Sequence, residues 1–301
     1  MMLINSNIRV FCSFALLVIT SMTYSCRTKI PIEFPDFKSL PVLNSFLVAD
    51  SVIRVHLSMA DALDTVPLPL VENATVSFYV NDTFTGNLYP AGNGYYETDV
   101  RAREGNIYRF EAEIPDFPTV SAQDSIPESV PLLSIEHILK AGVDDEGHTF
   151  PAVKITIPVN TQKIKYLHVL ARLNKNEGQW KDWQLKDFHD PVLVAEGLPI
   201  AVFSTELIQD TIYTMQIDYS TGGWRCLGDS CWMPLYPFVI ELKSISYAYY
   251  QYLKQLYLYN SGRYPDFQFA PYKAFPLFSN VNNGMGVVAG YSSYLSDVVN
   301  P

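Results

Sequence analysis

The chain has 301 residues, of which 48% are hydrophobic and 14% aromatic, and its formal net charge at pH 7 is −10. This hydrophobic fraction supports a packed core and excludes a disordered chain, and the length leaves room for two ordinary domains. An acidic chain repels nucleic acid phosphates, and no basic cluster offsets the charge, so a nucleic-acid partner is excluded. The 20 Tyr and 17 Phe residues favour β-structure, because aromatic rings fit pleated, half-buried surfaces.

The first 25 residues predict a secretory signal peptide. Arg9 supplies a positive end, Phe11–Ile19 an apolar run, and Thr20–Ser25 a small, polar stretch that ends at Cys26. The apolar run is about half as long as the ~20 residues that cross a bilayer, which argues against a transmembrane anchor.

Cys26 is the predicted site of lipid attachment and the first residue of the mature protein. Ser25 is the small residue expected before the cysteine of a bacterial lipobox, whereas Thr23 and Tyr24 depart from the usual pattern. The alternative is an ordinary cleaved signal peptide whose cysteine is incidental. Residues 26–40, punctuated by prolines, are expected to form a short tether.

Short alternating segments predict an N-terminal β-sandwich, Ig-like or regulatory-like, over residues 41–128. The clearest is Val52–Ser58, in which Ile53, Val55 and Leu57 share one face, a period of two that marks a half-buried strand. Glycine turns at regular spacing are typical of a sandwich. The other strands of this domain are expected within 41–48, 74–80, 86–89, 92–100, 104–114 and 119–122.

A proline-bounded stretch, Pro127–Pro131, is the expected boundary to a C-terminal β-rich domain over residues 129–301. A hairpin or wide loop is predicted between residues 173 and 188, and a closing strand follows a glycine-rich turn within residues 279–294. The other strands of this domain are expected at 134–139, 152–158, 166–173, 200–204, 211–219 and 238–242.

One amphipathic helix is predicted at about residues 244–260. Ser244 suits an N-cap and Gly262 a helix C-terminus. The alternative is a tyrosine ladder in a strand. The predicted fold is therefore mainly β, with two β-sandwich-like domains, the second carrying this helix. The apolar helical stripe consists of Ile245, Tyr249, Tyr252, Leu253 and Leu256.

Two of the four cysteines lie close together in WRCLGDSCW, as Cys226 and Cys231. In an oxidising compartment such a pair most simply forms a disulfide. A zinc site is the rival, but no histidine is near, and two thiolates do not fill the tetrahedral shell of zinc. Because the closed loop is short, the bond is expected to fix local shape.

Several motifs follow one another along the mature chain: PVLNSFLVAD, NATVSFYV, GNGYYETD, REGNIYRFEAE, CLGDSCW, LKSISYAYYQYLKQL and FSNVNNGMGVVAGY. In this order they resemble the Bacteroidota outer-membrane lipoproteins that carry the domain of unknown function DUF4249. The resemblance implies an accessory role beside a TonB-dependent β-barrel transporter. It implies no enzymatic activity and transfers no catalytic residues.

The resemblance also implies a lipid-anchored location at the outer membrane. Surface-exposed lipoproteins of this phylum tend to carry acidic residues directly after the lipidated cysteine. This chain has no acidic residue there before Glu33. Whether the protein faces the periplasm or the cell surface therefore stays open.

No catalytic or metal-binding motif is recognisable, and no cofactor is expected. The sequence contains no HExxH pair, G-x-S-x-G elbow, P-loop or dinucleotide fingerprint. The acidic turn Asp144–Glu146 is expected to be a solvated turn, because a calcium loop needs a longer, regular ligand spacing. The histidines are scattered, at His56, His137, His148, His168 and His189.

The tryptophans are the better functional candidates. Trp180 and Trp183 lie in a polar loop, and Trp224 and Trp232 flank the cysteine pair. Exposed tryptophans stack on sugars or anchor protein partners; the alternative is that these rings cap the sandwich core. We therefore expect a non-enzymatic binding or assembly subunit. The other hypotheses are an envelope glycan- or peptide-processing hydrolase, whose glycan version needs paired carboxylates, and a surface adhesin.

Overall fold

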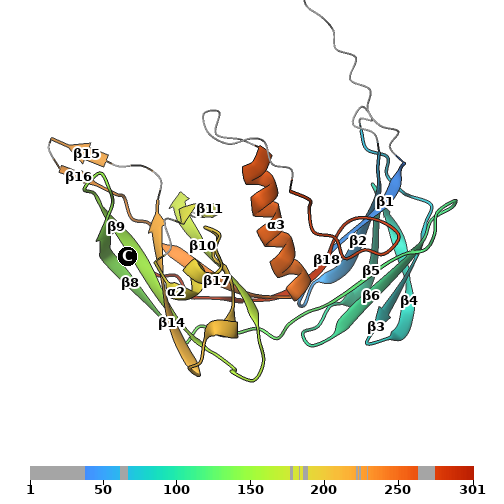
Figure 1. Ribbon diagram of the computed structural model, residues 1–301, viewed down its shortest axis with the longest axis horizontal. Helices are drawn as coiled ribbons and strands as arrows, with labels where there is room; N and C mark the ends of the chain where they lie inside the picture. The colour runs from blue at the N-terminus through green and yellow to red at the C-terminus, as the bar shows by residue number, and fades with distance from the viewer. Residues whose placement is uncertain are drawn as a thin grey trace, which may run out of the picture. The chain divides into compact units, whose positions relative to one another are not determined.

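A computed structural model gives the arrangement of the chain, which is mainly β with one long helix (Figure 1). The described residues belong to one compact unit, Lys38–Pro301. The signal peptide, Cys26, most of the tether, Trp183 and Trp224 lie outside the described residues. The structure describes residues 38–61, 67–176, 179–182, 184–185, 189–221, 223, 225–228, 230–263 and 275–301.

Most of the predicted strands form, several of them longer than expected. The first half contains β1 (Leu40–Val48), β2 (Val52–Ala60), β3 (Thr75–Val80), β4 (Thr83–Gly92), β5 (Tyr95–Arg101), β6 (Ile107–Glu113) and β7 (Val120–Ser125). The second half contains β8 (Ser134–Val143), β9 (Thr149–Pro158), β10 (Tyr166–Asn176), β11 (Gln179–Asp182), β12 (Gln184–Leu185), α2 (Pro191–Ala195), β13 (Val202–Ser204), η1 (Thr205–Leu207), β14 (Ile212–Ser220), β15 (Arg225–Leu227), β16 (Ser230–Trp232), β17 (Phe238–Ile245), α3 (Tyr247–Arg263) and β18 (Val288–Leu295).

The largest sheet runs through both halves of the sequence. Its order is β11-β10-β17-β18-β1-β2-β5-β4-β3-β6-β7, with β13 also paired to β10. The strand β18 joins the halves, because it pairs antiparallel with β17 and parallel with β1. A second sheet has the order β12-β14-β9-β8, and β15 and β16 form a separate hairpin.

The hydrophobic core of the first half follows from strand alternation. Ile53, Val55 and Leu57 of β2 are buried, as their spacing predicts, while their neighbours Val52 and Arg54 are exposed. The inward side chains of β1 to β7 meet in one cluster. This cluster includes Leu43, Leu47, Val76, Phe78, Tyr96, Tyr108, Phe110, Ala112, Val120 and Ala122.

The core of the second half lies between two sheets. The inner faces of β10 and β17 pack on those of β9 and β14 in a second cluster. Both halves are thus sandwich-like, as the fold class predicted. This core includes Val153, Ile155, Ile157, Leu167, Val169, Leu173, Met215, Ile217, Tyr219, Phe238, Ile240 and Leu242.

A segment near the C-terminus links β7 to β1 through backbone hydrogen bonds. Asn282 pairs with Ser121 of β7 in both directions, with N–O distances of 2.8 and 3.3 Å. The Met285 amide donates to Pro41 and its carbonyl accepts from Leu43 on β1, both at 2.9 Å. The two outer strands of the first half are therefore bridged by the chain itself.

Glycines make this close approach possible. A Cβ on Gly286, where φ is +117°, would lie 2.1 Å from the Leu43 carbonyl oxygen, and one on Gly290 would lie 2.2 Å from that of Ser125. A side chain at either position would force the backbones apart. The segment with Gly286 and Gly290, called the glycine seam below, therefore lies directly against the backbones of β1 and β7.

The predicted helix forms, but three residues later than expected. It covers Tyr247–Arg263, and its N-cap is Ser246, whose Oγ accepts a hydrogen bond from the Tyr249 amide at 3.1 Å. Ser244, the predicted cap, instead lies in β17 and is fully buried. The correction has a simple cause: β17 is buried on both faces, so its strand pairing continues to Ile245.

The aromatic side chains of α3 pack on the large sheet. The ring of Tyr250 lies 4.7 Å from that of Tyr166 on β10, and the ring of Tyr249 lies 5.3 Å from Phe46 and 5.6 Å from Tyr291. Tyr249 of the predicted stripe therefore packs as a helix residue rather than in a strand ladder, whereas Tyr250 was not part of that stripe and Ile245 of the stripe lies in β17.

Candidate functional site

The strand β8 carries an irregularity with a cavity on either side of it. Its pairing with β9 shifts register between Ile138 and Gly142. The Phe150 ring packs closely over Gly142 there, because a Cβ on Gly142 would lie 2.4 Å from the ring, which would then have to shift. Bulges of this kind redirect side chains and are enriched beside functional sites.

The first cavity, the Trp232 groove, has a volume of about 510 Å³. Its floor is largely apolar, while Lys140 and Arg225 bring two cations to it. Trp232 is 47% exposed and Leu139 57% exposed, so large apolar side chains face solvent here. Exposed apolar surface beside polar groups is typical of binding sites. The lining residues are Leu139, Lys140, Thr149, Pro151, Arg225, Trp232, Met233, Pro234, Leu235 and Tyr236.

The β15–β16 hairpin holds Trp232 in place. Its register sets Arg225 opposite Trp232 and Cys226 opposite Cys231. Opposite Cα atoms in an antiparallel pair lie ~4.5–5.5 Å apart, within the range that a disulfide spans. The disulfide itself stays a prediction. At the base of the hairpin, the Thr221 hydroxyl donates to the Pro234 carbonyl at 2.7 Å.

The second cavity, the Asp218 pocket, has a volume of about 470 Å³ and is mainly polar. Its deepest charge is Asp218, whose side chain is 2% exposed. One carboxylate oxygen lies 2.7 Å from Nδ1 of His189, and the other accepts from Gln216 at 3.1 Å. Sequence reasoning missed this pair, because His189 and Asp218 are 29 positions apart. The lining residues are Ala141, Gly142, Val143, Asp144, Asp145, Phe150, His189, Gln216 and Asp218.

Two of the four predicted contact tryptophans are described, and both reach solvent. Trp180 lies on β11, opposite Asn174, and is 40% exposed. Trp232 lies on β16, so the two rings belong to different hairpins. As for metals, the described residues contain no group of three or more His, Cys, Asp or Glu side chains that could hold an ion.

Comparison with known proteins identifies the family. The sequence model of a domain of unknown function, DUF4249, matches residues 27–295. The chain belongs to the DUF4249 family. No curated protein matches the sequence. The DUF4249 match ends at the last residue of β18, so it includes both halves, both cavities and the glycine seam. Among the described residues, no helix is long and apolar enough to cross a membrane.

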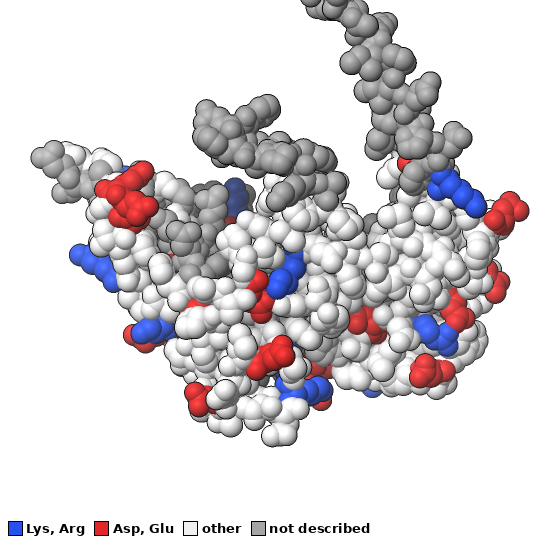
Figure 2. Space-filling model, viewed as in Figure 1, with Lys and Arg blue, Asp and Glu red and all other residues white. Residues whose placement is uncertain are grey.

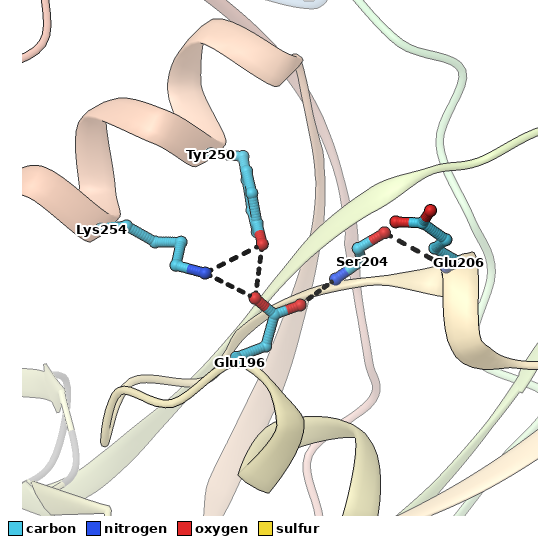
Figure 3. Close-up of polar contacts among 5 residues, drawn as sticks. All are labelled: Glu196, Ser204, Glu206, Tyr250 and Lys254. Atoms are coloured by element: carbon cyan, nitrogen blue, oxygen red, sulfur yellow. Dashed lines mark hydrogen bonds and ion pairs between the residues drawn. The ribbon is translucent and has the colours of Figure 1, made fainter.

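A partly buried polar cluster fastens α3 of this DUF4249 chain (Figure 3). Glu196, which follows α2, accepts from the Ser204 amide at 2.7 Å and from the Lys254 ammonium at 2.9 Å, and the Tyr250 hydroxyl also donates to it. Burial, then the hydrogen bond to Glu196, raises the pKa of Tyr250. Burial alone would lower the pKa of Lys254, but Glu196 and Tyr250 raise it. The cluster thus keeps a charged lysine and a neutral tyrosine, which suits an anchor for α3.

A second buried group, Asp124 of β7, lies where three distant segments meet. Its carboxylate accepts from the Gly290 amide on β18 at 2.8 Å and is hydrogen-bonded to Ser246, the N-cap of α3. Burial raises the pKa of Asp124 from 3.8 to about 6, although these hydrogen bonds oppose the rise. Asp124 therefore joins β7, β18 and α3, and lines neither of the two cavities.

Proposed function

We propose that this DUF4249 protein is a non-enzymatic binding or assembly subunit of a TonB-dependent outer-membrane transporter, held at the outer membrane of a Bacteroidota bacterium by lipid on Cys26. The Trp232 groove is the observation that carries the proposal. Trp and Arg are the residue types most enriched where binding energy concentrates in protein interfaces. Here Trp232 and Arg225 stand opposite each other on one hairpin, beside an apolar floor.

The carboxyl and imidazole groups with the largest pKa shifts lie outside the Trp232 groove and the Asp218 pocket, which favours binding over catalysis at these two sites. Catalytic acids and bases with strongly shifted pKa values cluster in clefts. In this chain, burial raises the pKa of Asp124 to about 6, and burial and then Lys243 lower that of His168 to about 4. Both groups lie on strands of the large sheet and line neither cavity. Their shifts therefore belong to the packing of the fold.

A photo-cross-linking residue in place of Trp232 tests the contact in intact membranes. We expect it to capture a TonB-dependent β-barrel, identified by mass spectrometry. Leu207, 65% exposed on η1 and outside the groove, is the matched control and is expected to capture none. Equal capture from both positions, or no barrel from Trp232, contradicts the proposal. If no β-barrel partner is found, the result favours the adhesin or the hydrolase hypothesis.

Lipid attachment needs its own test. Cys26→Ser is expected to abolish labelling with a fatty-acid probe and to release the protein from membranes, because the signal run is too short to span a bilayer. Cys12→Ser, in the same leader, is the control and leaves labelling unchanged. Membrane retention of the Cys26 variant at the wild-type level would contradict lipid anchoring.

A further inference from the structure

The Asp218 pocket is built differently from the Trp232 groove, and its chemistry points to a different ligand. Gln216 and Asp218 alternate along β14 with Met215, Ile217 and Tyr219, which are buried in the core. Since strand side chains alternate between faces, Gln216 and Asp218 lie on the face of the small sheet that points away from that core. The pocket is therefore separate from the groove proposed to contact a transporter.

Asp218 organises two pocket side chains at once. A carboxylate out of water is unfavourable unless its oxygens are hydrogen-bonded, and here both oxygens have partners. A carboxylate accepts, so Nδ1 of His189 carries a proton, and Nε2 is an acceptor whenever the ring is neutral. The Gln216 amide nitrogen donates to Asp218, which leaves its carbonyl oxygen as a second acceptor.

The remaining wall adds negative charge. The turn after β8 brings Asp144 and Asp145 to the pocket. Asp144 accepts from the His148 amide at 2.8 Å, which fixes the turn, whereas Asp145 is exposed to solvent. None of the described residues that line the pocket is Lys or Arg. Acidic side chains gather over this end of the molecule, near β15 and β16, in the view of Figure 2.

We propose that the Asp218 pocket binds a cationic nitrogen group, an ammonium or a guanidinium. Such groups carry several N–H donors and no acceptor, so they match an imidazole nitrogen, an amide oxygen and carboxylates. Charge-assisted hydrogen bonds to carboxylates are also the stronger kind. The volume of about 470 Å³ accommodates a small ligand or one basic side chain. His189, 69% exposed, is reachable from solvent.

Isothermal titration of the mature full-length chain in detergent tests this proposal. The probes are arginine amide, its uncharged counterpart citrulline amide, and spermidine. Arginine amide is expected to bind about tenfold more tightly than citrulline amide. Spermidine separates the two sources of such a ligand: tighter binding of spermidine indicates a free polyamine, and tighter binding of arginine amide indicates a basic peptide side chain.

Variants locate the binding. Asp218→Asn is expected to weaken arginine amide about tenfold, because it disturbs both oriented partners. Asp145→Asn, an exposed change that leaves the fold intact, is expected to weaken it about threefold. Asp116→Asn, an exposed aspartate outside the pocket, is the charge-matched control and has no effect. Equal binding of citrulline amide, equal effects of Asp145→Asn and Asp116→Asn, or no binding at all would overturn the proposal. The cross-linking result at Trp232 is independent of all three outcomes.

Discussion

The edge strands of the two halves of the chain differ in how they are covered. In the first half, the end strand β7 is bonded by Asn282, and the same segment continues to β1. In the second half, β8 ends the small sheet in the described part of the chain, and its bulged segment borders two cavities. An edge covered by its own chain is protected from other partners, whereas an edge with cavities is open to them. We therefore expect function in the second half and stability in the first.

The largest expected effect comes from placing a side chain in the glycine seam, which stabilises the first half. Gly290→Ala is expected to destabilise the protein by roughly 3 kcal/mol or more, or to prevent folding, because two backbones would have to separate. Gly92→Ala is the control: φ is +82° there, but nothing lies within 4 Å of the added Cβ. Strain alone costs about 1–2 kcal/mol. Denaturant unfolding compares the variants. Because Gly290 has no positive φ, its loss comes from close packing alone, and a loss below about 1 kcal/mol would contradict the importance of that packing.

The junction at Asp124 is expected to give a pH-dependent effect. Burial raises its pKa to about 6 in the folded chain, whereas the unfolded carboxyl titrates near 3.8. The folded state therefore holds the proton more tightly. Its contribution to stability is complete below about pH 4 and is lost as pH rises through about 6. Between pH 4 and 7 the wild type should lose about 2–3 kcal/mol relative to Asp124→Asn, which cannot ionise.

Urea unfolding of both proteins across this pH range measures the difference. The exposed Asp116→Asn variant serves as the reference for general charge effects. A constant difference between wild type and Asp124→Asn from pH 4 to 7 would contradict a raised pKa in the folded state. A difference that grows with pH would identify this junction as a weak point of the closed half.

The sequence predicts the strands far better than it predicts their partners. The spacing of Ile53, Val55 and Leu57 at every second position predicts a buried face, because this alternation is a local property of the sequence. The placement of β18 between β17 and β1 is not local, since one of its two pairings is parallel and joins distant segments. The predicted helix start is wrong for a related reason. The helical stripe does not reveal that β17 is buried on both faces, so the strand continues past Ser244 and Ser246 is the N-cap.

The same distinction applies to the candidate sites. Trp232 was recognisable, because a tryptophan beside a cysteine pair in a polar stretch is unusual for a core residue. The groove around it was not, since β8, β9 and the segment after β16 all contribute to it. The His189–Asp218 contact depends on how β14 faces the segment before α2. No spacing in the sequence encodes that contact.

A smaller effect is expected at the anchor of α3. Glu196→Gln keeps the shape of the side chain but removes the charge that Lys254 and Tyr250 contact. Lys254 is partly exposed, so water replaces part of the lost interaction, and a loss of about 1–2 kcal/mol is expected. Hydrogen exchange should localise it to α3 and spare β2 and β6. Protection lost equally in both halves would mean that α3 is not held locally.

The smallest effect on global stability is expected from the cysteine pair. If Cys226 and Cys231 are joined, mass spectrometry of unreduced peptides from envelope protein shows one linked species, and two free thiols would contradict the bond. Replacing both by serine frees a short hairpin, for which chain entropy predicts at most about 2 kcal/mol. The hairpin pairs only with itself among the described strands, so it can open without the cores. We therefore expect global unfolding to change little and the fluorescence of the exposed Trp232 to fall. With a photo-cross-linking residue in place of Trp232, we expect capture of the partner to fall as well. A reduced hairpin that still cross-links at the wild-type level would show that the groove is shaped by β8 and β9 alone.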